Sequence, residues 1–439
     1  MTDNLTPSMA STSTDTTFVA LPSPTNEALT EHSCRFCGSQ DLHSFVDLGM
    51  SPLCESFVKR EDLNRLEAFY PLHAFVCADC FLVQVPTLVS GEEIFGGEYA
   101  YFSSYSDSWL RHAAAYVDMI TDRLELNEQS QVIEVASNDG YLLKNFVAKG
   151  IPALGIEPAD NVAAVAIENG VPSLVRFFGV ETAKDLVANG TQADLLLGNN
   201  VLAHVPDVND FVKGFKILLR EGGVLTNEFP HLMCLVEQNQ FDTIYQEHYC
   251  YFSLLTAQSI YEKHGLTIFD VEEIPTHGGS LRIYSRHADD ESKPVTQAVK
   301  DLIERELAAG YGKLKTYLNF APQVEETKRK LLEFLIQAKR EGKTVAGYGA
   351  PGKGNTLLNY CGVRQDFIEY TVDRNPYKHD KFLPGTRIPI YATERLAETR
   401  PDYILILPWN LKDEIAEQLA YTREWGCQLV VPIPELTVF

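Results

Sequence analysis

The chain has 439 residues, which is too long for one ordinary hydrophobic core, so we expect about three domains. Its 45% apolar content is typical of a globular protein, and its formal net charge of −23 argues against a nucleic-acid partner, because phosphate binding needs a positive stripe and none appears. No apolar run approaches the length that spans a bilayer, so we expect no membrane partner.

Residues 1–30 are rich in Ser, Thr and Pro and contain neither a basic start nor an apolar segment. This composition predicts a disordered tail and not a signal peptide. The nine cysteines are an odd number spread over a long chain, which suits a reducing cytoplasm better than a disulfide framework. We therefore expect a cytoplasmic protein.

Two Cys-x-x-Cys pairs, Cys34 with Cys37 and Cys77 with Cys80, are separated by 39 residues. Each pair presents two thiolates on one side of a turn, and two such turns complete a tetrahedral zinc site. Four thiolates leave no open coordination position, so the predicted zinc is structural. His43 and His73 could each replace a ligand but lack a paired spacing, and Cys54, between the pairs, is expected to be a plain thiol.

The segment FGGEYAYFSSYSDSW (95–109) is crowded with Tyr and Ser. Such residues bury aromatic area while offering hydroxyl groups, which favours a lid over a polar ligand, and an interdomain packing strip is the alternative. In this segment we assign Tyr101 and Ser104 to a cofactor and Tyr99 and Tyr105 to a substrate.

Residues 132–158 predict half of a nucleotide-binding βαβ unit: a strand with Glu134, a turn of small and polar residues, a helix, and a strand ending at Glu157. Only Gly140 of the full G-x-G-x-x-G is placed as expected, and a pyrophosphate would need that closer approach, whereas S-adenosylmethionine tolerates a looser turn. Glu157, about 20 residues past the turn, can accept from both ribose hydroxyls. We therefore predict a methyl-donor site that contains Glu134, Ser137, Asn138, Gly140 and Glu157.

The next strands support a doubly wound parallel sheet. ADLLLGNNVLAHVPD (193–207) predicts a buried strand that opens into a loop, and EGGVLTNEFP (221–230) predicts a turn and another strand. Asn199, Asn200 and His204 cluster where a parallel strand would open into a cleft. We assign the two asparagines to the cofactor.

The segment FDTIYQEHYCYFS (241–253) is predicted to carry the chemistry. On a helix Tyr245 and His248 would share a face, while Glu247 could orient the imidazole in an irregular turn. A histidine held by a carboxylate is a suitable general base, and a Tyr hydroxyl can stabilise an oxyanion. The alternative is a core histidine among aromatic residues. THGGSLRIY (276–284) adds His277, Gly278 and Arg282 as candidates for contacting a sugar or phosphate.

The last third predicts long helices over 296–341 and then a second nucleotide-binding-like sheet. KTVAGYGAPGKGNTLLNY (343–360) resembles a phosphate-binding turn but is no Walker A motif, since Gly354 and Asn355 follow Lys353. A locally basic run, 374–387, and a strand within 401–410 follow. A purely structural α/β domain is the alternative to an acceptor site. The candidate acceptor residues are Lys353, Asn355, Arg374, Lys378, Arg387, Trp409 and Asn410.

From about residue 33 to its end the chain resembles the sugar-nucleotide C-methyltransferases of deoxysugar biosynthesis. The matching motifs are CRFCGS, CADCFLVQ, EYAYFSSYSDSW, VIEVASNDGYLL, GNNVLAHVPD, YQEHYCYFS, HGGSLRIY, GYGAPGKGNTLLNY, VDRNPYKHDKFLPGTRIPI and LPWNLKDEI. The resemblance implies a zinc-binding domain over 31–95, a Rossmann-like methyltransferase domain over 96–290 and a second Rossmann-like α/β domain over 291–439 that helps hold a nucleotide sugar. Cys54 departs from the family, whose members usually carry another residue there.

The resemblance also implies methyl transfer from S-adenosylmethionine to C3 of a dTDP-4-keto-6-deoxyhexose. The 4-keto group acidifies the C3 proton, so we expect His248 to act as base, oriented by Glu247, with Tyr245 steadying the oxyanion; His204 is the second candidate base. O- or N-methylation of such a sugar, and a non-catalytic sugar-nucleotide binding protein, are the rival hypotheses. We expect a monomer or a weak homo-oligomer.

Overall fold

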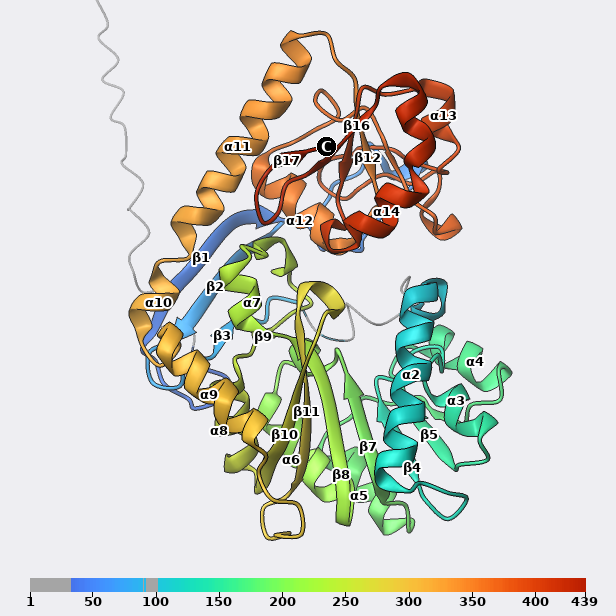
Figure 1. Ribbon diagram of the computed structural model, residues 1–439, viewed down its shortest axis with the longest axis vertical. Coiled ribbons are helices and arrows are strands. Elements are labelled where there is room, and N and C mark those ends of the chain that lie inside the picture. The colour runs from blue at the N-terminus through green and yellow to red at the C-terminus, as the bar shows by residue number, and fades with distance from the viewer. Residues whose placement is uncertain (1–32, 90, 92–101) are drawn as a thin grey trace, which may run out of the picture.

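The computed structural model describes residues 33–89, 91 and 102–439, which form three sheets (Figure 1). The tail predicted over 1–30, together with Tyr99 and Tyr101, lies outside the described residues. Among the described helices, none combines the length and the apolarity needed to cross a membrane.

The first sheet is antiparallel and has four strands in the order β1-β2-β3-β9. Its strands are β1 (Leu42–Ser51), β2 (Tyr70–Cys77), β3 (Val83–Gln84) and β9 (Cys250–Tyr251), with the short helix η2 (Arg60–Asp62) between β1 and β2. The fourth strand comes from the segment predicted to carry the chemistry. The N-terminal sheet is therefore completed by residues that are far away in sequence.

The central sheet has seven strands in the order β10-β11-β8-β7-β4-β5-β6. The parallel strands are β4 (Val132–Val135), β5 (Ala153–Ile156), β6 (Ser173–Leu174), β7 (Ala193–Asn199) and β8 (Leu219–Pro230), and the antiparallel pair is β10 (Leu266–Ile274) and β11 (Ser280–His287). The chain moves from β4 toward β5 and β6, then crosses back to β7 on the other side of β4. This switch point opens a crevice at the carboxyl ends of β4 and β7, where ligands bind in such sheets.

Alternating residues of the central strands feed two separate cores, as a buried parallel sheet requires. Leu196 joins a core with helices on one face, whereas Leu195 and Leu197 join a core on the other face. The helices on the first face are α5 (Val180–Ala188), α6 (Val208–Leu218) and α8 (Leu254–Lys263). Those on the second face are α2 (Asp107–Leu124), α3 (Leu143–Ala148) and α4 (Asp160–Glu168).

The third sheet has the order β14-β13-β12-β15-β16-β17 and is parallel except for β17. Its strands are β12 (Val345–Tyr348), β13 (Thr371–Val372), β14 (Ile390–Tyr391), β15 (Tyr403–Ile406), β16 (Gln428–Val431) and β17 (Thr437–Val438). The helices of this part are α11 (Ala321–Arg340), α12 (Gly352–Cys361), α13 (Arg395–Thr399) and α14 (Lys412–Gln418). The predicted pair of doubly wound sheets is thus present.

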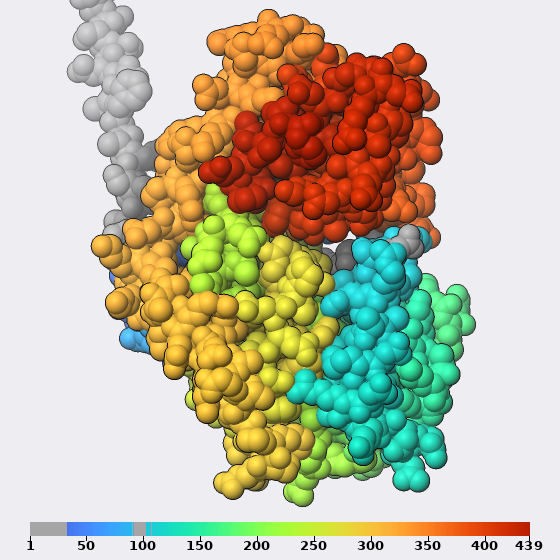
Figure 2. All heavy atoms as spheres, viewed as in Figure 1, coloured from blue at the N-terminus to red at the C-terminus, as the bar shows by residue number. Residues whose placement is uncertain are grey.

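The N-terminal sheet and the C-terminal sheet share one hydrophobic core, which also takes in residues of α7 (Leu232–Glu237). Figure 2 shows the C-terminal third, orange to red, resting on green and yellow residues of the central part. Helix α9 (Gln297–Ala309), which lies beyond the predicted boundary at 291, packs against α8 and β10, and the short α10 (Leu314–Leu318) packs against β1. The three sheets therefore form one packed body.

A buried ion pair fixes α9 to the central part. His231 Nε2 lies 2.7 Å from Glu306 Oε1, and both side chains are almost fully buried. The Glu306 carboxylate also accepts hydrogen bonds from the backbone N–H groups of Leu254 (2.6 Å) and Leu255 (2.9 Å), where α8 begins. Burial alone would lower the pKa of His231, but hydrogen bonds with Cys234 and Glu306 outweigh it and raise the pKa to about 9.

This pair predicts a loss of stability in alkali. Because the folded-state pKa of His231 is above its unfolded value, its stabilisation is complete below about pH 6.5 and disappears as the pH rises through about 9. The contribution should be about 3 kcal/mol. Calorimetric unfolding temperatures measured from pH 6 to pH 10 should fall more steeply for the wild type than for His231→Gln. The matched control is His43→Gln at an exposed site, which should keep the wild-type slope.

Candidate functional site

The four predicted zinc ligands come together. Their sulfur atoms all lie within 4.8 Å of one another, with 3.5 Å between Cys34 and Cys80 and 3.6 Å between Cys37 and Cys77. Four sulfurs around one zinc ion at 2.3 Å would be about 3.8 Å apart, so the cluster fits the metal. A hydrogen bond from Cys80 lowers the pKa of Cys34 to about 5, which favours the thiolate form that zinc requires.

The other candidate ligands of the N-terminal part lie elsewhere. His43 pairs with Asp41 at 2.9 Å, and His73 hydrogen-bonds with Ser44 at 2.8 Å. Cys54 is buried with its thiol toward Glu247, so it is not part of the zinc cluster. The zinc cluster itself is packed into the same core as one face of the central sheet.

The turn after β4 has three left-handed residues in alternation: Ala136 (φ 57°), Asn138 (φ 51°) and Gly140 (φ 75°). These are positions where glycine would be expected, because left-handed backbone strains other residues, though Asn tolerates it. A Cβ atom at Gly140 would lie 2.9 Å from Val171 Cγ2. The turn therefore has the tight form of a glycine-rich ligand-binding loop, which the sequence alone did not reveal.

Glu157 is held against this turn. Its Oε2 accepts from the backbone N–H of Asn138 at 2.9 Å, and its Oε1 accepts from that of Ala159 at 2.9 Å. Burial raises the pKa of Glu157, while the two N–H groups act to lower it. Each carboxylate oxygen has a second lone pair, so both can still accept from a ribose hydroxyl.

Polar atoms gather around the carboxyl ends of β4 and β7 without partners. Those with no hydrogen bond in the described part of the chain are Glu134 Oε2, Ser137 Oγ, Asp139 Oδ1, Asn199 Oδ1 and Asn200 Oδ1. Burial and the nearby acids raise the pKa of Glu134 well above its ordinary value. Buried polar groups normally have partners, so this concentration fits a polar ligand such as S-adenosylmethionine.

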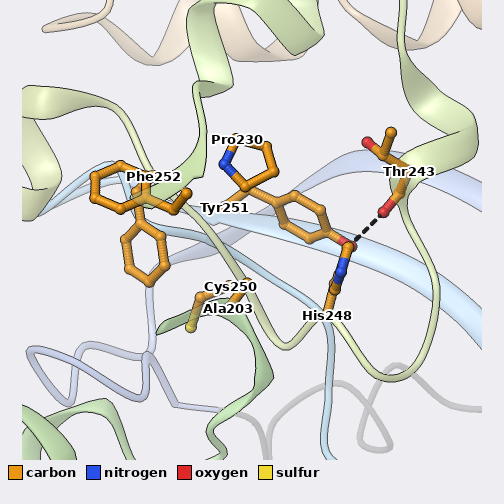
Figure 3. Close-up of a pocket in the computed structure, with 8 residues that line it drawn as sticks. Ala203, Pro230, Thr243, His248, Cys250, Tyr251 and Phe252 are labelled. Atoms are coloured by element: carbon orange, nitrogen blue, oxygen red, sulfur yellow. Dashed lines mark hydrogen bonds between the residues drawn. The ribbon is translucent and has the colours of Figure 1, made fainter. Parts of the chain in front are cut away.

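The segment around His248 is an irregular turn and not a helix, and it lies between η5 (Phe241–Thr243) and β9. His248 Nδ1 donates to the carbonyl oxygen of Thr243 at 2.8 Å (Figure 3). This bond leaves Nε2 as the nitrogen that can accept a proton. The imidazole ring is 4.0 Å from the ring of Tyr245 and 4.6 Å from that of His204, so the two candidate bases are neighbours.

The expected pairing of Glu247 with His248 is wrong. The Cys54 thiol donates to Glu247 Oε1 at 3.6 Å, and the backbone carbonyl of Thr243 orients the imidazole instead. Burial, reinforced by the charge of Glu55, raises the pKa of Glu247 to about 8. A backbone acceptor leaves no residue-type signal, which is why the sequence suggested the adjacent carboxylate.

Burial controls the ionisation of the candidate catalytic groups. It lowers the pKa of His248 well below its ordinary value and that of His204 to about 4, so both imidazoles are neutral near pH 7. Burial and the neighbouring Cys54 and Glu247 raise the pKa of Tyr245 well above its ordinary value. Tyr245 therefore keeps its proton and can donate a hydrogen bond. Ala203, Cys250, Tyr251 and Phe252 line a small cavity beside His248 (Figure 3).

Some acceptor candidates from the C-terminal part meet at this site. Trp409 Nε1 donates to Asp242 Oδ2 at 2.7 Å, directly before Thr243. Lys353 Nζ lies 4.7 Å from the Trp409 ring and donates to Asn410 Oδ1 at 2.9 Å. A Cβ atom at Gly278 would lie 2.6 Å from Trp409, so only glycine fits beneath the ring.

Two further acceptor candidates contact the segment that contains Cys54. Asn355 donates to the backbone oxygen of Cys54 at 2.6 Å. Lys378 Nζ donates to the Ala350 oxygen at 2.8 Å and lies 3.7 Å from Glu55. Arg374 lies just past the carboxyl end of β13. Its neighbour Asp373 accepts from the N–H of Ala350 at 2.7 Å, in the Gly-rich turn 349–354 at the junction of β12 and α12. Arg387 is different, because it pairs with Glu67 at 2.9 Å and is held away from the other acceptor candidates.

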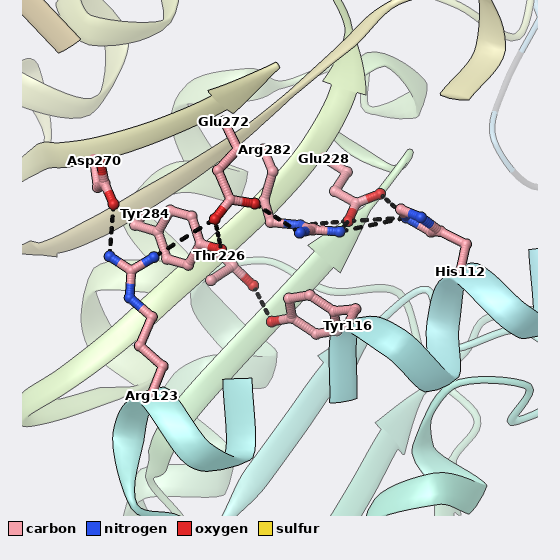
Figure 4. Close-up of polar contacts among 9 residues, drawn as sticks. All are labelled: His112, Tyr116, Arg123, Thr226, Glu228, Asp270, Glu272, Arg282 and Tyr284. Carbon is pink, nitrogen blue, oxygen red and sulfur yellow. Dashed lines mark hydrogen bonds and ion pairs between the residues drawn. The ribbon is translucent and has the colours of Figure 1, made fainter. Parts of the chain in front are cut away.

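Arg282, which we expected to contact the substrate, is already engaged. Its guanidinium lies 2.6 Å from Glu228 and 2.8 Å from Glu272, and it sits over the ring of Tyr116 (Figure 4). His112 of α2 also contacts the Glu228 carboxylate, at 3.0 Å. The arginine thus pairs with the buried Glu228 and the partly exposed Glu272 on the two neighbouring strands, and its contact with Tyr116 ties α2 to the sheet. Sequence spacing could not reveal these cross-strand partners.

Comparisons with known proteins agree with this geometry. Residues 34–95 match a family model described as "Putative zinc binding domain", 109–271 a "Methyltransferase domain", and 275–434 a "C-methyltransferase C-terminal domain". The chain is 36% identical over 404 residues to "C-methyltransferase NovU" from Streptomyces niveus, covering 92% of this chain and 95% of that protein.

Solved structures are also similar to part of the chain. An S-adenosylmethionine-dependent methyltransferase from Clostridium acetobutylicum is 12% identical, with a TM-score of 0.34, covering 40% of this chain and 92% of that one. The magnesium protoporphyrin IX methyltransferase of Synechocystis, solved with bound S-adenosylmethionine, is 14% identical, with a TM-score of 0.31, covering 44% and 88%.

The cysteine cluster predicts one zinc ion per chain. Cys37→Ser should lose the metal and lower the unfolding temperature, because metal binding stabilises only the folded cluster. Cys54→Ser, outside the cluster, should keep a full zinc content. Metal analysis by plasma mass spectrometry, together with calorimetry, measures both. A zinc content that Cys37→Ser leaves unchanged would contradict the ligand set.

Proposed function

The chain belongs to the family of S-adenosylmethionine-dependent C-methyltransferases, and from this premise we propose that it methylates C3 of a nucleotide-linked 4-keto-6-deoxyhexose. The observation that carries the proposal is the setting of His248. Its Nδ1 is committed to the Thr243 carbonyl, and its neutral ring lines a cavity beside the Tyr245 ring. Carbon methylation needs such a base, whereas O- or N-methylation can rely mostly on positioning.

His248 Nε2 takes the C3 proton of the acceptor, whose 4-keto group acidifies that position. An enolate and an imidazolium form together, so the net charge of the buried site does not change. This matters because an isolated charge would be costly there. The Tyr245 hydroxyl, which keeps its proton, donates to the oxygen on which negative charge develops. When bound, S-adenosylmethionine supplies an electrophilic methyl group for the nucleophilic C3.

His204 supports this arrangement from the side. Its ring meets the His248 ring edge to face, and it hydrogen-bonds with the backbone of Glu247. We assign it to aligning the base. Glu247 faces Cys54 and is assigned to holding the turn, not to orienting the imidazole.

The two ligands have separate sets of residues. For the donor we propose Glu157 at the ribose, with Ser137, Asn138, Asn199 and Asn200 around the turn. The sugar of the acceptor is assigned to the cluster that joins the central and C-terminal parts, and its diphosphate to the cations beside the Gly-rich turn. The cluster residues are Gly278, Lys353, Trp409 and Asn410, together with His277, whose ring lies 5.2 Å from that of Trp109. The cations are Arg374 and Lys378.

Analysis of the product tests the reaction class. Incubation with a thymidine diphosphate 4-keto-6-deoxyhexose and methyl-labelled donor should give an alkali-stable methyl group on C3, identified by carbon NMR. A methyl group on oxygen or nitrogen would refute the proposed chemistry. Absence of transfer to any nucleotide-linked keto sugar would refute the substrate class.

Replacing the base should separate binding from chemistry. His248→Asn should retain both ligands but lose on the order of 10²–10⁴ in turnover, with a parallel loss of C3 proton exchange in deuterated water. His204→Asn should lose less in both. The control is His264→Asn, a residue paired with Asn209 away from the site, which should behave like wild type. If His204→Asn abolished proton exchange while His248→Asn retained it, the roles would be reversed.

Replacing the ribose acceptor should act on the donor. Glu157→Ala should weaken S-adenosylmethionine binding by about 1.5–3 kcal/mol, the usual range for hydrogen bonds to a charged group. Titration calorimetry measures this loss. Glu168→Ala, at an exposed position on the next helix, is the matched control and should leave donor affinity unchanged. Equal affinities in the two variants would remove Glu157 from the donor site.

A further inference from the structure

Three aromatic rings meet between the central part and the C-terminal part. Tyr377 lies 6.1 Å from Phe102 and 5.9 Å from Tyr105, and Phe102 and Tyr105 are 5.9 Å apart. Tyr105 is 53% exposed and Tyr377 is 56% exposed. Exposed aromatic rings that gather across a junction are unusual enough to need an explanation. We call these three residues the aromatic clasp.

One side of the clasp is tied to the donor turn. Phe102 and Tyr105 flank Ser103 and Ser104, in the short helix η3 (Ser103–Tyr105). The Ser103 N–H donates to Asn138 Oδ1 at 2.8 Å, and the Ser104 N–H donates to Asp139 Oδ2 at 3.1 Å. Because the backbone of Asn138 also donates to Glu157, one hydrogen-bonded unit joins the donor turn to the clasp.

The other side is tied to the Gly-rich turn of the C-terminal part. Tyr377 lies in η7 (Pro376–Lys378), where its N–H donates to Asn375 Oδ1 at 2.9 Å. Asp373 accepts from the N–H of Asn375 at 2.8 Å and from that of Ala350 at 2.7 Å. Lys378 Nζ donates to the Ala350 oxygen. These hydrogen bonds link the position of Tyr377 to that of the Gly-rich turn that contains Ala350.

We infer that Tyr105 and Tyr377 are positioning residues that couple occupancy of the donor turn to the order of the loop 373–378 in the C-terminal part. That this loop also holds the acceptor's diphosphate rests on the proposed function. The donor and acceptor are assigned to different sheets, and methyl transfer requires reacting atoms about 3–3.5 Å apart. A contact that spans both supports fixes that separation better than either sheet alone.

The first test needs only the methyl donor. Hydrogen–deuterium exchange is followed by mass spectrometry with and without S-adenosylmethionine. In the wild type the donor should slow exchange at least about threefold in the peptide that spans 373–381, although no donor residue is assigned there. Tyr105→Ala and Tyr377→Ala should lose this protection while keeping protection of the donor turn itself.

Two variants serve as controls. Tyr377→Phe keeps the ring but loses the hydrogen bond between the Tyr377 and Tyr105 side chains. It should keep the protection, so that loss in Tyr377→Ala alone reports the ring contact. Tyr421→Ala removes a partly exposed tyrosine of the same part of the chain, whose ring contacts Trp425 and not the clasp. It should behave like wild type. If the wild-type loop showed no donor-dependent protection, or if Tyr377→Ala retained it, the inference would be overturned.

The second test measures the coupling of affinities. Thymidine diphosphate is titrated with and without S-adenosylhomocysteine, and the wild type should bind it about fivefold more tightly with that product present. Tyr377→Ala should bind equally in both conditions. If Tyr377→Ala weakened thymidine diphosphate binding by the same factor with and without S-adenosylhomocysteine, the coupling would be intact. That result would assign Tyr377 to stacking on the thymine ring and overturn the inference. If the wild type bound no thymidine diphosphate, the proposed function would fail, and hydrogen exchange would still decide the role of the clasp.

Discussion

The segment 241–252 is held by hydrogen bonds from the N-terminal, central and C-terminal parts of the chain. Tyr249 donates its N–H to the Ala203 oxygen at 2.7 Å and accepts from the N–H of Val85 at 3.0 Å. Thr356 of α12 donates its hydroxyl to the Ile244 oxygen at 3.1 Å. An irregular segment satisfies only some of its own backbone groups, so its conformation also depends on these outside partners. The position of His248 depends on these contacts.

This dependence gives the zinc cluster an indirect role. The metal cannot bind substrate through a closed set of four thiolates, but β3, a few residues past Cys80, pairs with β9, which begins two residues after His248. The C-terminal part contributes equally, since Trp409 donates to Asp242 at the start of the segment. Loss of either neighbour should displace His248 before it unfolds the central sheet.

Buried charge is the second constraint on this acidic chain. Glu228 is fully buried and pairs with the guanidinium of Arg282, and His112 hydrogen-bonds to the same carboxylate, which makes the ion pair costly to break. Within the described residues neither Glu134 nor Glu247 forms an ion pair with a cation, and burial raises the pKa of each. The buried acids are therefore of two kinds. Glu228 is paired with a cation and ties neighbouring elements together, whereas Glu134 and Glu247 take up a proton more readily than an exposed carboxylate does.

The sequence by itself determined the fold class and the cysteine cluster and predicted a donor site after the first central strand, because spacing, strand–helix alternation and the family motifs are local properties. It also brought His204, Tyr245 and His248 to attention. Only the tertiary structure decided that a backbone carbonyl, and not Glu247, orients His248, because a carbonyl carries no residue-type signal. The left-handed Ala136 and the pairing of Arg282 were equally hidden, since backbone dihedral angles and cross-strand partners are fixed by packing between segments distant in the chain.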